Sequence, residues 1–167
     1  MEELSPDELS FLASMFDLAR EGDRVLGEYV DQGLPVNLTN RAGDTLLIVA
    51  AYHQHVELVQ ALVERGADHS RVNDRGQTAL AAGVFRQSRP VVETLLGAGA
   101  DPTRGPQSAL DIARFFDLRE MLDLLQAGRS GTAKETASTD GQGWPRTRPA
   151  KNGQRYSRAR PRNDGQR

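Results

Sequence analysis

The feature that most constrains this chain is a sequence pattern that returns at a fixed interval. Gly33, Gly66 and Gly99 are evenly spaced, and each follows an apolar run and precedes a polar turn; Thr45 and Thr78 keep the same spacing where the next runs begin. A fixed period between about 20 and 50 residues is typical of a solenoid, in which copies of one short unit stack in a row. We therefore expect neighbouring units, rather than one closed globule, to bury the apolar side chains.

The recurring residues also fit the local structure of paired helices. Glycine at the three equivalent positions suits a left-handed residue that ends a helix, because it has no side chain to strain the backbone. Thr45, Thr78 and Ser108 suit N-caps, whose hydroxyl oxygens accept hydrogen bonds from free amides of the first turn. After the short run "TLLIVAA", the segment "VELVQALVE" places its apolar residues at helical spacing. One such helix pair is too thin to bury its own apolar face, so the pairs must stack.

These motifs resemble the ankyrin repeat, with its glycine turn, Thr-x-Leu helix start, paired alanines, second helix and closing Gly-Ala-Asp. The resemblance runs from residue 16 to residue 128 and is clearest in "GDTLLIVAAYHQHVELVQALVERGAD", residues 43–68. It implies an all-α ankyrin-repeat solenoid of stacked helix-turn-helix units with short β-hairpin or turn loops. Two departures are visible: Gln54 and Gln87 replace the usual glycine between paired helices, and Ser108 follows Thr78 more closely than the period requires. The shorter spacing predicts a truncated loop before the last repeat.

The chain divides into three parts on this pattern. Residues 1–15 contain a capping box, "SPDE", and should form an N-terminal capping helix. This helix is expected to cover the open end of the stack with Leu9, Leu12, Met15 and Phe16. Residues 129–167 contain Gly, Ser, Thr, Pro and Arg with almost no aliphatic side chains, so we expect a disordered tail. The repeats between these ends are expected at residues 16–42, 43–75, 76–104 and 105–128.

Residue types exclude several classes of function. The chain has no cysteine, which excludes disulfides and thiolate chemistry. His53 and His55 are two residues apart, whereas helical metal ligands need a spacing of three or four. There is no phosphate-binding loop and no evident pairing of nucleophile and base, so we expect no metal, no cofactor and no enzymatic activity. Without a signal sequence or an apolar run long enough to span a bilayer, we expect a cytoplasmic monomer.

Charge is divided unevenly along the chain. Residues 1–128 hold 11 Lys and Arg against 20 Asp and Glu, a net charge of −9, whereas residues 129–167 hold 10 against 3, a net charge of +7. With Trp144 and Tyr156, the basic tail has the composition to hold single-stranded nucleic acid. It would also suit an anionic membrane surface, or a loose cover over the acidic body of the same chain. A solubilising extension without a partner is the remaining interpretation.

Three repeats place an aromatic residue directly after the first helix, and the spacing of these residues follows the repeat, including its shorter last step. The resemblance implies that this position lines the concave groove of an ankyrin stack. We predict that the three rings stack there and, with the residues that follow them, bind a partner protein. The alternative is that the rings lie flat against neighbouring turns and shield the core. The predicted groove residues are Tyr52, His53, Phe85, Arg86, Phe115 and Phe116.

The hairpin tips are a second candidate surface, represented by Arg41, Asp44, Arg75 and Gln77. The resemblance implies that tips of this kind contact partners, although loop residues are also polar simply because loops are solvated. The mixed signs of the tips and the acidic body argue against nucleic-acid binding by the repeats. The leading prediction is a non-catalytic module that binds an unidentified protein through the groove and the tips. The alternative is a nucleic-acid-associated protein that acts through the basic tail.

Overall fold

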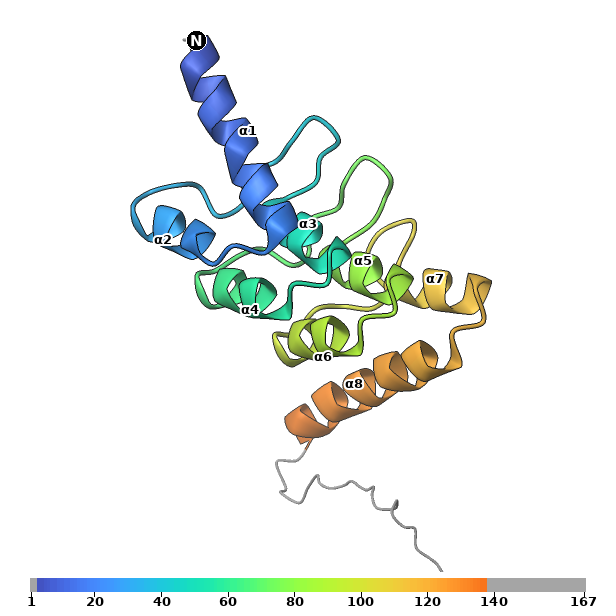
Figure 1. The fold of residues 1–167 in the computed structure, drawn as a ribbon. Helices are drawn as coiled ribbons and strands as arrows, with labels where there is room; N and C mark the ends of the chain where they lie inside the picture. Colours follow the sequence, from blue (N-terminus) through green and yellow to red (C-terminus); the bar gives the residue numbers. More distant parts are fainter. Residues whose placement is uncertain (1–2, 138–167) are drawn as a thin grey trace, which may run out of the picture. The chain divides into compact units, whose positions relative to one another are not determined.

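The computed structural model describes residues 3–137, with side chains as far as residue 128 (Figure 1). Within this range the chain forms paired helices, and the all-α stack predicted from the period is confirmed. The described loops contribute one isolated antiparallel β-bridge, between Thr39 and Thr45. The helices are α1 (Pro6–Glu21), α2 (Val25–Asp31), α3 (Leu46–Tyr52), α4 (Val56–Glu64), α5 (Ala79–Phe85), α6 (Arg89–Gly97), α7 (Ala109–Phe115) and α8 (Arg119–Ala137).

The first helices of the pairs, α1, α3, α5 and α7, form one row, and we call them the inner helices. The outer helices α2, α4 and α6 form a second row beside it (Figure 1). Each inner helix packs on its neighbours, α1 on α3, α3 on α5 and α5 on α7. Every residue of α5 from Ala79 to Val84 is therefore buried, and α3 is buried over its first six residues. Gly83 permits this packing, since a Cβ atom there would lie 3.0 Å from Cγ1 of Val91. Its cost as a helical residue, about 1 kcal/mol against alanine, is thus offset by a close helix contact.

The predicted helix starts and stops are present. The hydroxyls of Thr45, Thr78 and Ser108 each accept a hydrogen bond from the amide three residues further along, at 3.1, 3.2 and 3.1 Å. The glycines that end the outer helices all have positive φ angles: Gly33 (115°), Gly66 (88°) and Gly99 (97°). The turn chemistry that sets the period in the sequence therefore also sets the helix ends.

The N-terminal helix differs from the expectation. The capping box forms as predicted, with the Ser5 hydroxyl and the Glu8 carboxylate each accepting a hydrogen bond from the other residue's amide. However, α1 continues to Glu21, across the expected boundary at residue 15. Met15 and Phe16 are buried against the stack as expected, whereas Leu9 is 53% exposed. The cause is length, because α1 has 16 residues whereas α3, on which it packs, has seven. The first turns of α1 thus extend past the stack (Figure 1).

The C-terminal boundary also differs. The chain forms two compact units, and the first of them ends at Gln126. Of the second unit, the structure describes only the end of α8, as far as Ala137. Disorder was expected from residue 129, but the helix continues beyond it, because elongating a helix that packing has already started requires no new nucleus. The rest of the tail, residues 138–167 with Trp144 and Tyr156, lies outside the described residues.

The turns between paired helices hold left-handed residues that are not glycine. Gly22 occupies this place in the first pair with a φ of 79°, but Gln54, Gln87 and Asp117 follow with φ angles of 66°, 56° and 53°. A side chain in this conformation is strained because its Cβ atom approaches the following carbonyl oxygen. Each of these turns therefore stores strain that glycine would relieve.

We expect Gln87→Gly to raise the free energy of unfolding by about 0.5–1 kcal/mol, the strain relieved less the extra freedom of glycine in the unfolded chain. Urea denaturation measures the change. The matched control is Gln60→Gly in α4, where the same replacement falls within a helix and should cost about 1 kcal/mol. Destabilisation by Gln87→Gly as large as that of the control would contradict the interpretation.

Candidate interaction groove

Two hollows lie where the inner helices meet the loops that join the helix pairs. We call these loops fingers: finger 1 is residues 32–45, finger 2 is residues 65–78 and finger 3 is residues 98–108. The first hollow, of about 410 Å³, is lined from α1, α3, α5 and the first two fingers. The second, of about 390 Å³, is lined from α5, α7 and fingers 2 and 3. Gln77 and Phe85 line both hollows, so the two are adjacent, and we refer to them together as the groove.

An aromatic row runs along the groove. The rings of Tyr52 and Phe85 stack with centroids 6.2 Å apart and planes 14° apart. The row continues from Phe85 to Phe116, whose ring meets it edge-on at 5.8 Å. The expectation that Phe115 would be the third stacked ring is wrong: Phe115 is 82% exposed and meets Phe116 edge-on. No further repeat follows α7 in the described residues, so no neighbouring turn covers Phe115.

Three basic side chains, those of Arg86, His53 and Arg20, lie beside the rings. The guanidinium carbon of Arg86 stands 5.0 Å from the centre of the Tyr52 ring, and His53 meets the same ring edge-on. Partial desolvation of the ring lowers the pKa of His53, and the positive charges of His55, Arg20 and Arg86 lower it further. Arg20 lines the first hollow but was not among the predicted residues. Its signal was present in the sequence, because it stands one full period before His53.

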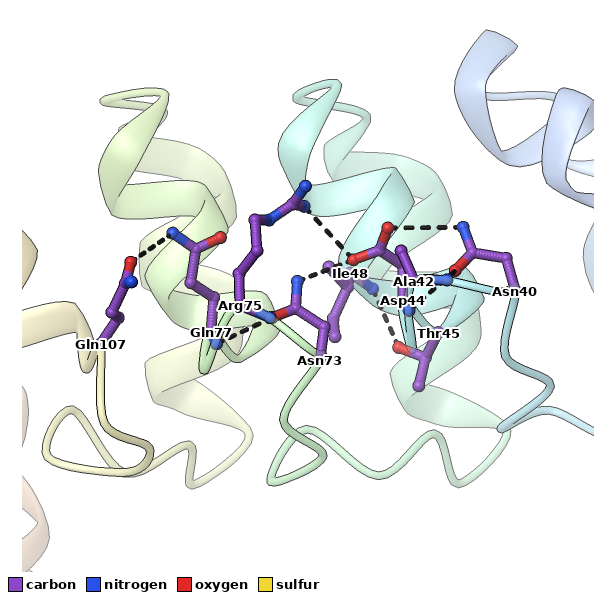
Figure 2. A network of polar contacts seen from close by, with 9 residues as sticks. All are labelled: Asn40, Ala42, Asp44, Thr45, Ile48, Asn73, Arg75, Gln77 and Gln107. Carbon is purple, nitrogen blue, oxygen red and sulfur yellow. Dashed lines mark hydrogen bonds and ion pairs between the residues drawn. The ribbon is translucent and has the colours of Figure 1, made fainter.

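Finger 2 holds its shape through one buried amide (Figure 2). The Oδ1 atom of Asn73 accepts hydrogen bonds from the amides of Arg75 and Gln77 at 3.0 and 2.9 Å. Its Nδ2 atom donates to Oδ1 of Asp44 in finger 1, at 2.7 Å. The same residue thus closes its own turn and ties it to the preceding finger.

Further bonds join the fingers to one another. The Nη2 atom of Arg75 lies 3.4 Å from Oδ1 of Asp44, and Nε2 of Gln77 donates to Oε1 of Gln107 in finger 3 at 3.1 Å (Figure 2). Finger 3 is shorter, as predicted, and lies close to finger 2: a Cβ atom on Gly105 would stand 2.7 Å from the carbonyl oxygen of Gly76. The fingers therefore form a connected wall along the groove.

The four predicted tip residues differ in where they lie and in what they bond. Arg75 and Gln77 line the groove while bonded to neighbouring fingers. Asp44 also lines it, but its side chain is only 13% exposed and its carboxylate accepts bonds from within the wall. Arg41 is exposed and lies outside both hollows. Sequence reasoning missed the asparagines that organise the wall, Asn40 and Asn73, although they too are separated by one full period.

His55 serves the stack rather than the groove. The Nε2 atom of His55 lies 2.7 Å from the backbone oxygen of Arg20, so this ring braces the first two repeats. Within residues 3–137, no group of three or more His, Asp or Glu side chains is placed to hold a metal ion. Over the same residues, no helix has the length and apolar character needed to cross a bilayer.

Comparison with known proteins agrees with this geometry. The family model for ankyrin repeats, in three copies, matches residues 15–105, more than half of the chain. A curated protein of Pseudomonas aeruginosa, named as an ankyrin repeat protein, is 44% identical over 59 residues, which cover 35% of this chain and 34% of that protein. Ankyrin repeats generally act as protein–protein interaction modules. The family model spans the fingers and helix pairs that build the groove, and the chain belongs to the ankyrin repeat family.

Proposed function

We propose that this chain is a non-catalytic module that binds a partner protein along the groove, with Phe85 at the centre of the contact. The observation that carries the proposal is the position of Phe85, a large apolar side chain that is 42% exposed and lines both hollows. Exposed aromatic residues surrounded by polar groups are typical of the few positions that dominate binding energy. Here the finger wall supplies the polar groups.

The rigidity of the groove supports the same function. Its floor belongs to inner helices that are buried in the stack, and its wall consists of fingers already bonded to one another. A surface that is ordered before binding loses little conformational entropy when a partner arrives. The tips then contribute through Arg75 and Gln77, which line the groove, rather than through Asp44, whose carboxylate is held within the wall.

The test compares proteins captured from the source organism by the full chain and by the double variant Tyr52→Ala with Phe85→Ala. Removal of two central rings should reduce recovery of a groove partner at least about tenfold, as for interface positions worth about 2 kcal/mol or more. The matched control is Phe11→Ala, since Phe11 is an exposed aromatic on α1 that contacts Tyr29 outside the groove.

Circular dichroism establishes that each variant keeps its helices. A partner that the double variant retains in full, or that only Phe11→Ala loses, would place the contact elsewhere on the molecule. Equal recovery of every captured protein by all three chains would remove the groove from the function.

A further inference from the structure

The two ends of the groove differ in polarity. The first hollow is lined by the cations Arg20 and Arg75 and by His53, and Arg86 stands on its Tyr52 edge. The second hollow is lined mainly by apolar side chains, which are those of Phe85, Pro106, Ile112, Phe115 and Phe116. The groove therefore offers positive charge toward α1 and apolar surface toward α7.

Two carboxylates also line the groove, and both are bonded within the scaffold. Asp44, in the first hollow, is mostly covered and accepts bonds from Asn73 and Arg75. Asp111, in the second, accepts a bond from the hydroxyl of Ser108 at 2.7 Å. Both carboxylates thus hold the scaffold, and the side chain of Asp44 is 13% exposed whereas that of Arg75, its partner, is 58% exposed.

The cations keep donors for a ligand. Arg20 is paired with Asp17 and Arg75 with Asp44, but both arginine side chains are about half exposed or more and both pairs are weak in that setting. A guanidinium has five N–H donors, so a single carboxylate contact leaves most of them available. The guanidinium of Arg86 contacts the Tyr52 ring, which leaves its donor edge for an anion.

We infer that the groove takes an extended acidic segment of a partner protein, with its carboxylates in the first hollow and one bulky apolar side chain in the second. This inference depends on the proposed function. The hollows are one to two repeats apart, and at about 10 Å per packed helix and about 3.3 Å per extended residue the acidic and apolar positions are about three to six residues apart. The basic side chains of the first hollow favour an acidic ligand. The apolar second hollow favours a polypeptide, which can supply a bulky apolar side chain, over an anionic polymer that lacks one.

Acidity should strengthen this binding. The charged groups that face His53 are Arg20 on α1, His55 in the turn before α4 and Arg86 at the end of α5, all of which oppose its protonation. A bound carboxylate favours the protonated ring, so the pKa of His53 is higher in the complex than in the free protein. Affinity therefore rises as the pH falls from about 8 to about 6, where aspartate itself does not titrate.

The experiment measures fluorescence anisotropy of labelled peptides with the full chain. The probe is a Ser- and Gly-rich peptide with a run of aspartates and, about five residues away, one phenylalanine; matched peptides carry lysine for aspartate or serine for phenylalanine. The aspartate peptide should bind at least about tenfold more tightly than the lysine peptide, and more weakly as salt rises. Arg20→Gln should weaken it about two- to fivefold, and His53→Gln should remove the pH dependence.

Three results would overturn the inference: equal or tighter binding of the lysine peptide, equal binding of the serine peptide, or displacement of the probe by a single-stranded RNA of similar length at lower concentration. Absence of binding by every peptide would also overturn it. None of these results touches the proposed function, which depends on whether Tyr52→Ala with Phe85→Ala loses a native partner whatever the partner's charge. Arg20 and His53 are exposed, so their glutamine variants should keep the fold.

Discussion

Replacing Leu80 with alanine will lower the free energy of unfolding by about 2–5 kcal/mol, the range for large-to-small changes in a packed core. Leu80 is fully buried in α5, the helix that packs on α3 on one side and on α7 on the other. The truncated side chain leaves a cavity at the middle of the stack, where neighbours on both sides lose contacts. Because repeat stability depends on nearest-neighbour interfaces, the loss weakens two interfaces at once. Urea denaturation, monitored by circular dichroism, measures this loss in the free energy of unfolding.

The equivalent leucine of the last repeat provides the matched control. Leu110 takes the place of Leu80 in that repeat and is also buried, but its helix α7 has an inner neighbour, α5, on one side only within the described residues. Leu110→Ala should therefore cost less than Leu80→Ala. A second control, Leu9→Ala on the exposed part of α1, should change stability by less than about 0.5 kcal/mol. Equal losses at Leu80 and Leu110 would argue against additive nearest-neighbour coupling in this stack.

Asn73→Ala should have the next largest effect, a loss of about 2–3 kcal/mol, because it removes a charge-assisted hydrogen bond and leaves buried groups without partners. The amides of Arg75 and Gln77 lose their acceptor, and the carboxylate of Asp44 loses its shortest donor. Thermal and urea unfolding measure the change. A loss below about 0.5 kcal/mol, the size of an ordinary surface substitution, would show that the fingers do not depend on this side chain.

Asn73→Asp separates the two roles of this amide. It keeps an oxygen to accept from the two backbone amides but places a second carboxylate against Asp44, 2.7 Å from where Nδ2 now donates. Repulsion raises the pKa of the introduced carboxyl in the folded state above its unfolded value. Its destabilisation should therefore be small below about pH 4 and grow as the pH rises toward the folded-state pKa. A loss independent of pH would mean that closure of finger 2, rather than the bond to Asp44, is what matters.

Local rules were enough to predict the stack. The regular period, the N-caps at Thr45, Thr78 and Ser108 and the glycine helix ends each follow from backbone chemistry that a single sequence displays. Their agreement with one another made the fold predictable without knowledge of tertiary contacts. The shortened finger 3 followed from the same counting.

What the sequence did not reveal depends on how the copies meet. Which of Phe115 and Phe116 joins the aromatic row is decided by the turn after α7, not by the repeat spacing. The role of Asn73 as a link between fingers requires two loops to be placed side by side. The long α1 was missed because a capping box marks where a helix begins but not how far it projects from its neighbour.

The bonds between fingers also bear on the kinetics of recognition. Asn73 and Gln77 hold each loop to the next before any ligand is present. When a segment binds in the groove, most of the conformational entropy is therefore lost by the ligand and little by the protein. Association does not require the fingers to rearrange first. Ligands that differ in affinity should consequently arrive at similar rates and differ chiefly in how long they stay.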